Sequence, residues 1–392
     1  MGAVEAVRMT TDSPLVLDHA VVSLPKAGEE LCGDSVRIVK HDQATIVVLA
    51  DGLGSGVKAN ILSTMTVRIA ATLAERGLPV EDIVDTISRT LPVCKTRNLA
   101  YSTFTIVHID AAGYARLVEF DNPPALLIRN GELVNLVRRK RRVGTHTVIE
   151  ASFQLEEGDY LVLVSDGVIH AGIGGLVPLG WQWRNLADYL CRNAEAGETA
   201  YTMAHRVEKT VRHLYEGKLG DDSTVLVLRM RVPNQLTVLV GPPENPRDDA
   251  KVAHLFKQAA GNKVVCGGTT ASIIAREWQA PLSVDLSSLS PDTPPSAHLP
   301  GVNLTTEGII TVSQALDHIK SNKPIRGDQG TSAKLAKILL AADAVHFIVG
   351  RAINPAHQNP SLGGRLALKF QVIEDLQREL KKQGKNVTVT CY

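Results

Sequence analysis

The chain has 392 residues, in which 42 lysines and arginines nearly balance 41 aspartates and glutamates, giving a net charge of +1 at pH 7. This balance excludes a general attraction to nucleic acid or to an anionic membrane surface. No apolar run is long enough for a membrane-spanning helix, and the N-terminus lacks the pattern of a signal peptide. The five cysteines are scattered along the chain, which is typical of reduced thiols, so we expect a cytoplasmic protein of two or three domains.

The first half of the chain alternates short apolar strands with longer helices. Strands are predicted at 45–50, 102–109, 115–120, 125–129, 132–137, 160–165 and 224–230. Helices are predicted at 57–76, 81–91 and 199–215. Asn130 and Gly131 predict a tight hairpin, because both central residues of a type I′ turn need a positive φ. Close-set hairpins with helices packed outside them predict an antiparallel α+β domain over residues 14–232.

The pattern changes near residue 233. Strands are predicted at 236–240, 263–266, 344–349 and 387–390, and helices at 247–260, 269–278, 332–340 and 366–382. This alternation predicts a smaller α/β domain over residues 235–392, made of βαβ units with a parallel sheet. The segment 282–300 is rich in serine and proline and is predicted to be an extended loop.

Acidic residues mark the ends of several predicted strands in the first half. Asp51 and Asp166 each follow an apolar strand and precede a glycine, while Asp34 lies near the start of the domain. Asp221 and its neighbour Asp222 come just before the last strand. One such site could be an ordinary turn. Several carboxylates at one rim of a sheet would repel one another unless cations neutralised them, and Mg²⁺ and Mn²⁺ prefer oxygen ligands.

The order of these sites resembles the motif set of the PPM family of metal-dependent serine/threonine protein phosphatases, in particular its bacterial SpoIIE/RsbX-type branch. The matching segments are GDS at 33–35, ADGLGSGVKA at 50–59, EFDNPPALL at 119–127, SDGV at 165–168 and GDDST at 220–224. The resemblance covers the first half of the chain. It implies an α-β-β-α sandwich, in which two antiparallel sheets lie between helical layers and hold metal ions at one end.

The resemblance also implies a ligand set for two, or three, Mn²⁺ or Mg²⁺ ions. Asp51 would bridge two ions, and the carbonyl of Gly52 would help to bind one of them. Asp166 and Asp221 would hold the second ion.

For two of the acidic residues the resemblance implies an indirect role in metal binding. At one further position the sequence differs from the eukaryotic-type members of the family. Asp34 matches an outer aspartate that acts through waters or an additional metal ion, and Asp222 matches the neighbour of the usual ligand. Eukaryotic-type members carry a phosphate-gripping arginine before the first aspartate, whereas the corresponding segment here holds only Lys26. Substrate affinity is then expected to depend on docking surfaces.

The implied activity is hydrolysis of phosphoserine and phosphothreonine in proteins, by direct attack of a metal-bridging hydroxide. In the resembled branch the substrates are phosphorylated anti-sigma-factor antagonists or similar switch proteins, and here the C-terminal domain would regulate the enzyme. Two alternatives stay open. The first half could be a non-catalytic module that binds phosphoproteins, or the C-terminal domain could bind or act on a small anionic ligand.

Five consecutive basic residues follow the predicted hairpin: Arg138, Arg139, Lys140, Arg141 and Arg142. The simplest interpretation is a solvated loop. The alternative is a docking patch for an acidic phosphoprotein, which would raise the association rate in a salt-dependent way. Binding of nucleic acid is not expected, because no aromatic residues alternate with the basic ones.

A glycine-rich turn separates a strand from a helix in the second half. Its residues are Gly267, Gly268, Thr269 and Thr270. Backbone N–H groups at a glycine-rich helix start can bind an anion. The alternative is a tight turn in which threonine caps the helix. The second half resembles no family that we recognise.

Overall fold

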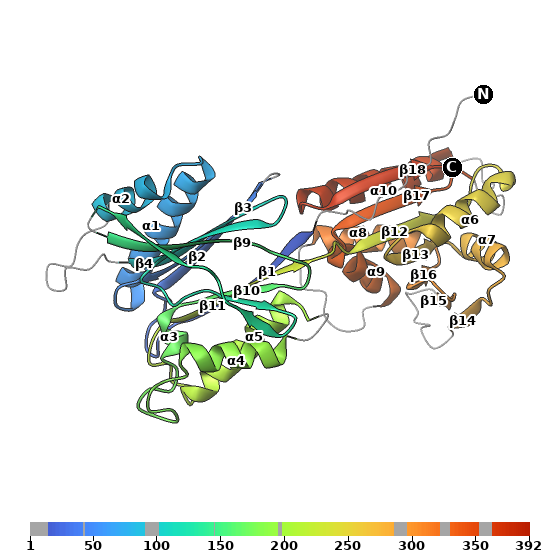
Figure 1. The fold of residues 1–392 in the computed structure, drawn as a ribbon. Helices are drawn as coiled ribbons and strands as arrows, with labels where there is room; N and C mark the ends of the chain where they lie inside the picture. The colour runs from blue at the N-terminus through green and yellow to red at the C-terminus, as the bar shows by residue number, and fades with distance from the viewer. Residues whose placement is uncertain are drawn as a thin grey trace. The chain divides into compact units, whose positions relative to one another are not determined.

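The computed structural model describes residues 15–41, 44–90, 102–144, 146–194, 198–285, 296–321, 330–352 and 363–392. The chain divides into two compact units, residues 1–232 and 233–392 (Figure 1). None of the described helices is long and apolar enough to cross a membrane.

Two antiparallel sheets form the centre of the first unit. The six-stranded sheet has the order β2 (Asp34–Lys40), β3 (Ala44–Gly52), β4 (Ser102–Asp110), β5 (Tyr114–Phe120), β9 (His146–Gln154) and β8 (Arg139–Val143). The five-stranded sheet has the order β1 (Val16–Leu24), β11 (Ser223–Arg231), β10 (Tyr160–Val164), β6 (Leu126–Arg129) and β7 (Glu132–Val134). At the β6–β7 hairpin, Asn130 and Gly131 have φ values of 52° and 76°, as predicted for the turn.

Helices cover the outer face of each sheet (Figure 1). Helices α1 (Gly56–Glu75) and α2 (Val80–Thr90) pack on the six-stranded sheet, and α4 (Trp183–Asn193) and α5 (Ala200–Leu214) pack on the five-stranded one. Along β3, Val47 and Leu49 enter the core between the sheets, while Ile46 and Val48 face the helices. This alternation is the two-residue period of a strand that is buried on both faces. The predicted α-β-β-α sandwich is therefore confirmed.

Several elements of the first unit were not predicted. These are β1, β2, β8, β9, α4 and the short helix α3 (Asp166–Ile169). The interpretation of the basic run as a solvated loop is wrong, because Arg139 to Val143 form β8, the edge strand of the six-stranded sheet. An edge strand can carry many charged side chains, since part of it faces solvent, so a charged composition hid the strand.

The second unit is built on one sheet flanked by helices. Its order is β14 (Ser283–Asp285), β15 (Ser296–His298), β16 (Leu304–Thr306), β13 (Asn262–Cys266), β12 (Gln235–Val240), β17 (Ala344–Val349) and β18 (Asn386–Cys391). The strands from β16 to β18 are mutually parallel, as predicted. Strand β15 is antiparallel to both of its neighbours, so the sheet is mixed. The predicted loop at 282–300 therefore contains two short strands, and its middle, 286–295, lies outside the described residues.

The helices of the second unit lie on both faces of its sheet. Helices α6 (Asp249–Gln258) and α7 (Gly268–Trp278) pack on one face, through a core that includes Phe256 and Ile274. Helices α8 (Ile309–Lys320), α9 (Gly330–Ala341) and α10 (Gly363–Lys382) pack on the other. The chain winds from β12 outward to β16, then crosses to β17 on the other side of β12. In such doubly wound sheets, ligands usually bind at the carboxyl edge of the strands.

Candidate metal centre

The pairing of β2 with β3 places two of the predicted ligands side by side. Asp34 begins β2 and lies directly opposite Asp51 near the end of β3. The N–H of Gly52 donates to the carbonyl of Gly33 over 3.3 Å, which continues the ladder beyond this pair. Antiparallel pairing thus brings together two carboxylates that lie far apart in the sequence.

The other sheet supplies the remaining acidic residues from two neighbouring strands. Asp166 follows the end of β10 and begins α3, while Asp221 and Asp222 precede the start of β11. The N–H of Ser165 donates to the carbonyl of Thr224 over 3.0 Å, and the N–H of Thr224 donates to Ser165 Oγ over 2.8 Å. These bonds hold the end of one strand against the beginning of the next, so their aspartates share one edge.

Electrostatic interaction connects the aspartates of the two sheets. Burial raises the pKa of Asp51 to about 9, and the charges of Asp34, Asp166 and Asp221 add to the shift. Burial also raises the pKa of Asp34 to about 6, with a contribution from the charges of Asp222 and Asp166. Carboxylates from both sheets therefore face one another across the end of the sandwich. Their ionisation destabilises the folded protein, because the charges are buried and repel one another.

Three carboxylate oxygens at this end are buried without a hydrogen-bond partner among the described residues. They are Oδ1 and Oδ2 of Asp34 and Oδ2 of Asp222, and the two residues are only 4% and 3% exposed. The remaining oxygen, Oδ1 of Asp222, accepts the backbone N–H of Lys26 over 2.9 Å. The hydroxyls of Ser165 and Thr224 lie close enough to Asp34 to oppose the rise in its pKa, but neither makes a hydrogen bond of regular geometry to it. Unpaired buried carboxylate oxygens are rare because they lose their hydration without compensation. Divalent cations would supply the missing partners, so this donor set fits hard metal ions.

The glycines beside the aspartates are required by close packing. A Cβ atom on Gly52 would lie 2.1 Å from the carbonyl oxygen of Ala59 in α1, and one on Gly167 would lie 2.0 Å from the carbonyl oxygen of Asp222. The carbonyl of Gly167 accepts the hydroxyl of Tyr215 over 2.8 Å. The Asp-Gly pairs thus let the strand ends approach α1 and β11 closely, which a larger residue would prevent.

The described residues contain no group of three or more Asp, Glu, His or Cys side chains that is arranged to hold a metal ion as it stands. Magnesium ions usually keep several waters and take only one or two carboxylates directly, so the arrangement is compatible with a hydrated site. The assignment of individual ligands stays a prediction. It covers six residues: Asp34, Asp51, Gly52, Asp166, Asp221 and Asp222.

Lys26, which was singled out from the sequence, and His170 lie beside the acidic cluster, and Glu29 lies at the loop that leads into α1. The cationic side chain of Lys26 lies close enough to Asp221 to oppose the rise in its pKa, which burial and Asp166 cause. Glu29 Oε1 accepts the hydroxyl of Ser55 over 3.1 Å, in the loop that leads into α1. His170 Nδ1 lies 3.9 Å from Asp166 Oδ2.

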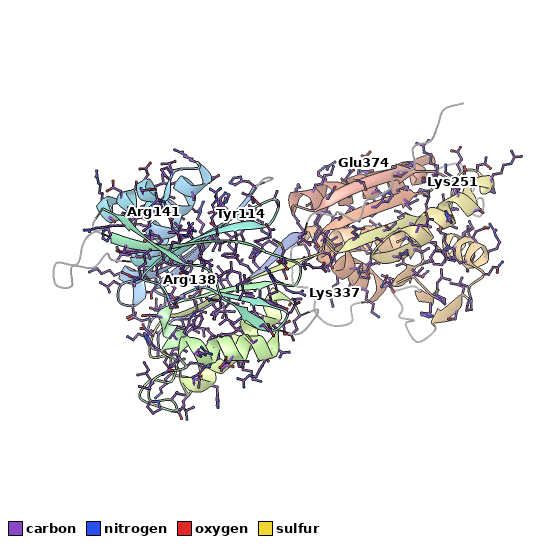
Figure 2. The ribbon with its side chains drawn as sticks, in the orientation of Figure 1. Tyr114, Arg138, Arg141, Lys251, Lys337 and Glu374 are labelled. Atoms are coloured by element: carbon purple, nitrogen blue, oxygen red, sulfur yellow. The ribbon has the colours of Figure 1, made fainter. Side chains whose placement is uncertain are left out.

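The members of the basic run have different surroundings, and two of them, Arg138 and Arg141, are labelled in Figure 2. Arg138 Nε lies 3.1 Å from Glu119, which is 2% exposed, so this arginine compensates a buried charge. Arg141 pairs with Glu81 in α2 and, over 3.0 Å, with Glu150 in β9. The candidate docking patch is thereby reduced to the other three members of the run: Arg139, Lys140 and Arg142.

The glycine-rich turn belongs to the second unit, whereas the aspartates and the basic run belong to the first. Gly267 precedes α7, and Gly268, Thr269 and Thr270 form its first turn.

A family model and the similar proteins of known name point to the same family. Residues 41–231 match the family described as Stage II sporulation protein E (SpoIIE). The chain is 23% identical over 238 residues to Stage II sporulation protein E of Bacillus subtilis (strain 168), which covers 58% of this chain and 26% of that protein. It is 20% identical over 222 residues to the phosphoserine phosphatase RsbU of the same organism, which covers 55% of this chain and 64% of that protein. The chain thus spans less than two thirds of the length of these relatives.

Among solved structures, the chain matches that of the PP2C phosphatase domain and a fragment of the regulatory domain of SpoIIE from Bacillus subtilis. The match has 22% sequence identity and a TM-score of 0.47, and it covers 55% of this chain and 64% of that one.

Replacing Asp51 by Asn is expected to stabilise the metal-free protein at pH 8. Because the pKa of Asp51 rises from 3.8 to about 9 on folding, the folded state binds a proton more tightly than the unfolded state. Wild type therefore loses stability as the pH rises through this range, whereas Asn cannot ionise. Urea unfolding in EDTA should give a higher free energy of unfolding for Asp51→Asn than for wild type at pH 8. The difference between the two proteins should be smaller at pH 5.

The exposed residue Asp188 in α4 provides the control, since Asp188→Asn should leave stability unchanged at both pH values. If Asp51→Asn were no more stable than wild type at pH 8, the carboxylates would not be in mutual repulsion.

Proposed function

We propose that the first unit, whose residues 41–231 form a domain of the SpoIIE family of PP2C-like phosphatases, is a metal-dependent phosphatase of phosphoserine and phosphothreonine in proteins. The observation that carries the proposal is the convergence of aspartates from two sheets at one end of the sandwich. Asp34 and Asp51 come from one sheet, and Asp166 comes from the edge of the other. Burial, together with the charges of Asp34 and Asp166, raises the pKa of Asp51, and a bound cation would relieve both effects.

The residues that would hold two Mn²⁺ or Mg²⁺ ions are Asp51, the carbonyl of Gly52, Asp166 and Asp221. Asp34, with both oxygens unpaired, is the candidate for an outer or third ion. When bound, the ions supply a nucleophile at neutral pH and neutralise charge on the phosphoryl group.

Other residues of the chain orient these groups. Ser102 Oγ donates to the carbonyl of Asp51 over 2.8 Å and fixes the backbone at the end of β3. Asn60 Nδ2, from α1, donates to the carbonyl of Cys32 over 2.8 Å and fixes the segment that leads to Asp34. Lys26 is half-buried beside Asp221, where its ammonium group can attract the phosphate dianion of a substrate.

The relatives suggest a class of substrate. One of them is named a phosphoserine phosphatase, so we propose that this chain dephosphorylates a regulatory phosphoprotein in bacterial signalling. The second unit would regulate that activity. The competing function is a module that binds phosphoproteins without hydrolysing them, and it is disfavoured because all of the predicted acidic positions are retained.

The chain should hydrolyse p-nitrophenyl phosphate and a phosphothreonine peptide with Mn²⁺ present, and lose activity in EDTA. Asp51→Asn should lower kcat/KM by about 100-fold or more, since even groups that only orient metal ligands can be worth 10- to 100-fold. Asp188→Asn is the matched control and should retain full activity. Absence of metal-dependent turnover in wild type, together with tight binding of the phosphopeptide, would instead favour the non-catalytic module.

The basic edge strand is expected to contribute to substrate affinity but not to chemistry. Lys140 and Arg142 are exposed on β8, which lies four strands from β3, or about 20 Å at about 4.8 Å per strand. Replacing both by Glu should lower kcat/KM for a phosphothreonine peptide with acidic flanks by about tenfold at low salt. Hydrolysis of p-nitrophenyl phosphate should not change.

The loss in kcat/KM for the peptide should become smaller as salt is added, because salt screens exposed charges. Charge reversal of the exposed residues Arg184 and Lys209, on α4 and α5, provides a control of equal charge change. An equal loss in both double variants would assign the effect to net charge and rule out a local docking patch.

A further inference from the structure

Two helices of the second unit begin side by side at the carboxyl edge of the sheet. Strands β13 and β16 are parallel neighbours, with Cys266 opposite Thr306, and α7 and α8 follow them directly. The N–H of Gly267 donates to the carbonyl of Thr306 over 2.8 Å. A Cβ atom on Gly308 would lie 3.9 Å from the Cα of Gly267. The two helix starts are therefore in contact.

Neither helix start is capped by a side chain. The N-cap residues are Gly267, with φ of 125°, and Gly308, with φ of 157°, and neither helix has a side-chain cap hydrogen bond. The N–H groups of a first helical turn have no acceptor within the helix. They also carry the positive end of the helix dipole. Two such ends next to each other favour an anion more than one end does. In α7 the first of these N–H groups, that of Gly268, donates to the carbonyl of Glu307 over 3.3 Å, so an anion would be bound by those of Thr269 and Thr270.

Buried hydroxyl groups at the same place provide independent evidence of a missing partner. The Oγ1 atoms of Thr270 and Thr311, in the first turns of α7 and α8, have no hydrogen-bond partner among the described residues. The two residues are only 2% and 1% exposed. Unpaired buried hydroxyls are uncommon in native proteins. The second unit thus holds a set of unused donors where two helices begin.

The hydroxyl of Thr270 points back toward the helix start. Its Oγ1 lies 2.9 Å from the position that a Cβ atom on Gly267 would take. A Cβ atom on the next residue, Gly268, would meet no atom within 4 Å other than those of its chain neighbours and of its own helix backbone. The backbone at Gly268 is therefore open to close approach by a ligand, next to a hydroxyl that has no partner.

Charged groups near this edge include one half-buried cation. The ammonium group of Lys369, in α10, donates to the carbonyls of Gly350 and Ala352. It lies 3.1 Å from where a Cβ atom on Gly241 would be. The N–H of Gly241 in turn donates to the carbonyl of Cys266 over 3.2 Å. This cation favours an anionic ligand, whereas the exposed Glu307, between Thr306 and Gly308, opposes one.

Thiol chemistry is disfavoured at this edge. Burial raises the pKa of Cys266 to about 12, so its thiol stays protonated and is a poor nucleophile. The groups that remain are donors suited to hold a ligand.

We propose that the second unit binds the phosphoryl group of a small molecule, either free phosphate or a phosphate monoester, at the paired starts of α7 and α8. The phosphoryl oxygens would lie beside Gly268 and accept hydrogen bonds from the N–H groups of Thr269 and Thr270 and from the hydroxyl of Thr270. This site belongs to the second unit and does not depend on the phosphatase activity proposed for the first.

Equilibrium dialysis of the full-length chain with radiolabelled orthophosphate tests the site. EDTA is present throughout, so that phosphate cannot be retained by metal ions in the first unit. Wild type should bind phosphate, and Asp51→Asn should bind it equally well. Thr270→Val should weaken binding by about tenfold, the effect of losing one hydrogen bond to a charged group. Gly268→Val, which fills the open space, should abolish binding.

Thermal unfolding separates a ligand-binding role from a structural one. Without phosphate, Thr270→Val should be at least as stable as wild type, because it removes an unpaired hydroxyl without changing shape. Thr66→Val is the matched control, since the buried hydroxyl of Thr66 donates to the carbonyl of Leu62 over 2.8 Å. That variant should melt at a lower temperature and still bind phosphate as wild type does.

Adenosine monophosphate and adenosine distinguish the two sources of the phosphoryl group. A shift in melting temperature with the monophosphate and orthophosphate, but not with adenosine, supports a site for phosphate monoesters. A shift with orthophosphate alone supports a site for the free anion. No binding of either phosphate by wild type would overturn the proposal. Unchanged binding in both Thr270→Val and Gly268→Val, or destabilisation of the phosphate-free Thr270→Val protein, would also overturn it.

Discussion

Repulsion among buried carboxylates is the constraint on which the first unit depends. Asp34 and Asp51 face each other across two strands, and the charge of Asp166, from the other sheet, acts on both. In the absence of cations, such a group of buried acids holds protons and costs stability. If the proposed cations were bound, the same groups would form a centre able to polarise a phosphoryl oxygen. On this proposal, burying the carboxylates lowers the free energy of unfolding of the metal-free protein, and cation binding would offset that loss.

The sandwich places this cluster through backbone geometry. In each sheet, one strand ends and its antiparallel neighbour begins at the same edge, so their aspartates lie together. Glycines at these positions allow the backbone to approach the next element closely. At Gly52 the close neighbour is the backbone of α1, and at Gly167 it is the backbone at Asp222. A cluster assembled from strand ends is rigid, because ladder hydrogen bonds fix each backbone. The surface strand β8 is less constrained, and its charges can serve recognition.

Local sequence patterns were sufficient for elements that are buried on both faces. The apolar run that forms β3 predicted this strand, and Asp51-Gly52 predicted its end. The register between Asp34 and Asp51 could not be predicted from propensity, because β2 is only half-buried and its pattern is weak. Strand β8 was missed because its charges are tolerated only at a sheet edge. In the second unit, Gly267 marked a turn, but its partner Gly308 is distant in sequence, and only the pairing of β13 with β16 brings them together.

The central claim is that the aspartates of the first unit share divalent cations, and electron paramagnetic resonance of bound Mn²⁺ tests it most directly. Titration of the metal-free chain should reveal two bound Mn²⁺ ions per chain, with the spin coupling expected of ions about 3.5–4 Å apart. Asp51→Asn should abolish that coupling, because the proposed bridging group is lost. Failure of wild type to bind Mn²⁺, or a single uncoupled ion that is unaffected by Asp51→Asn, would contradict the account.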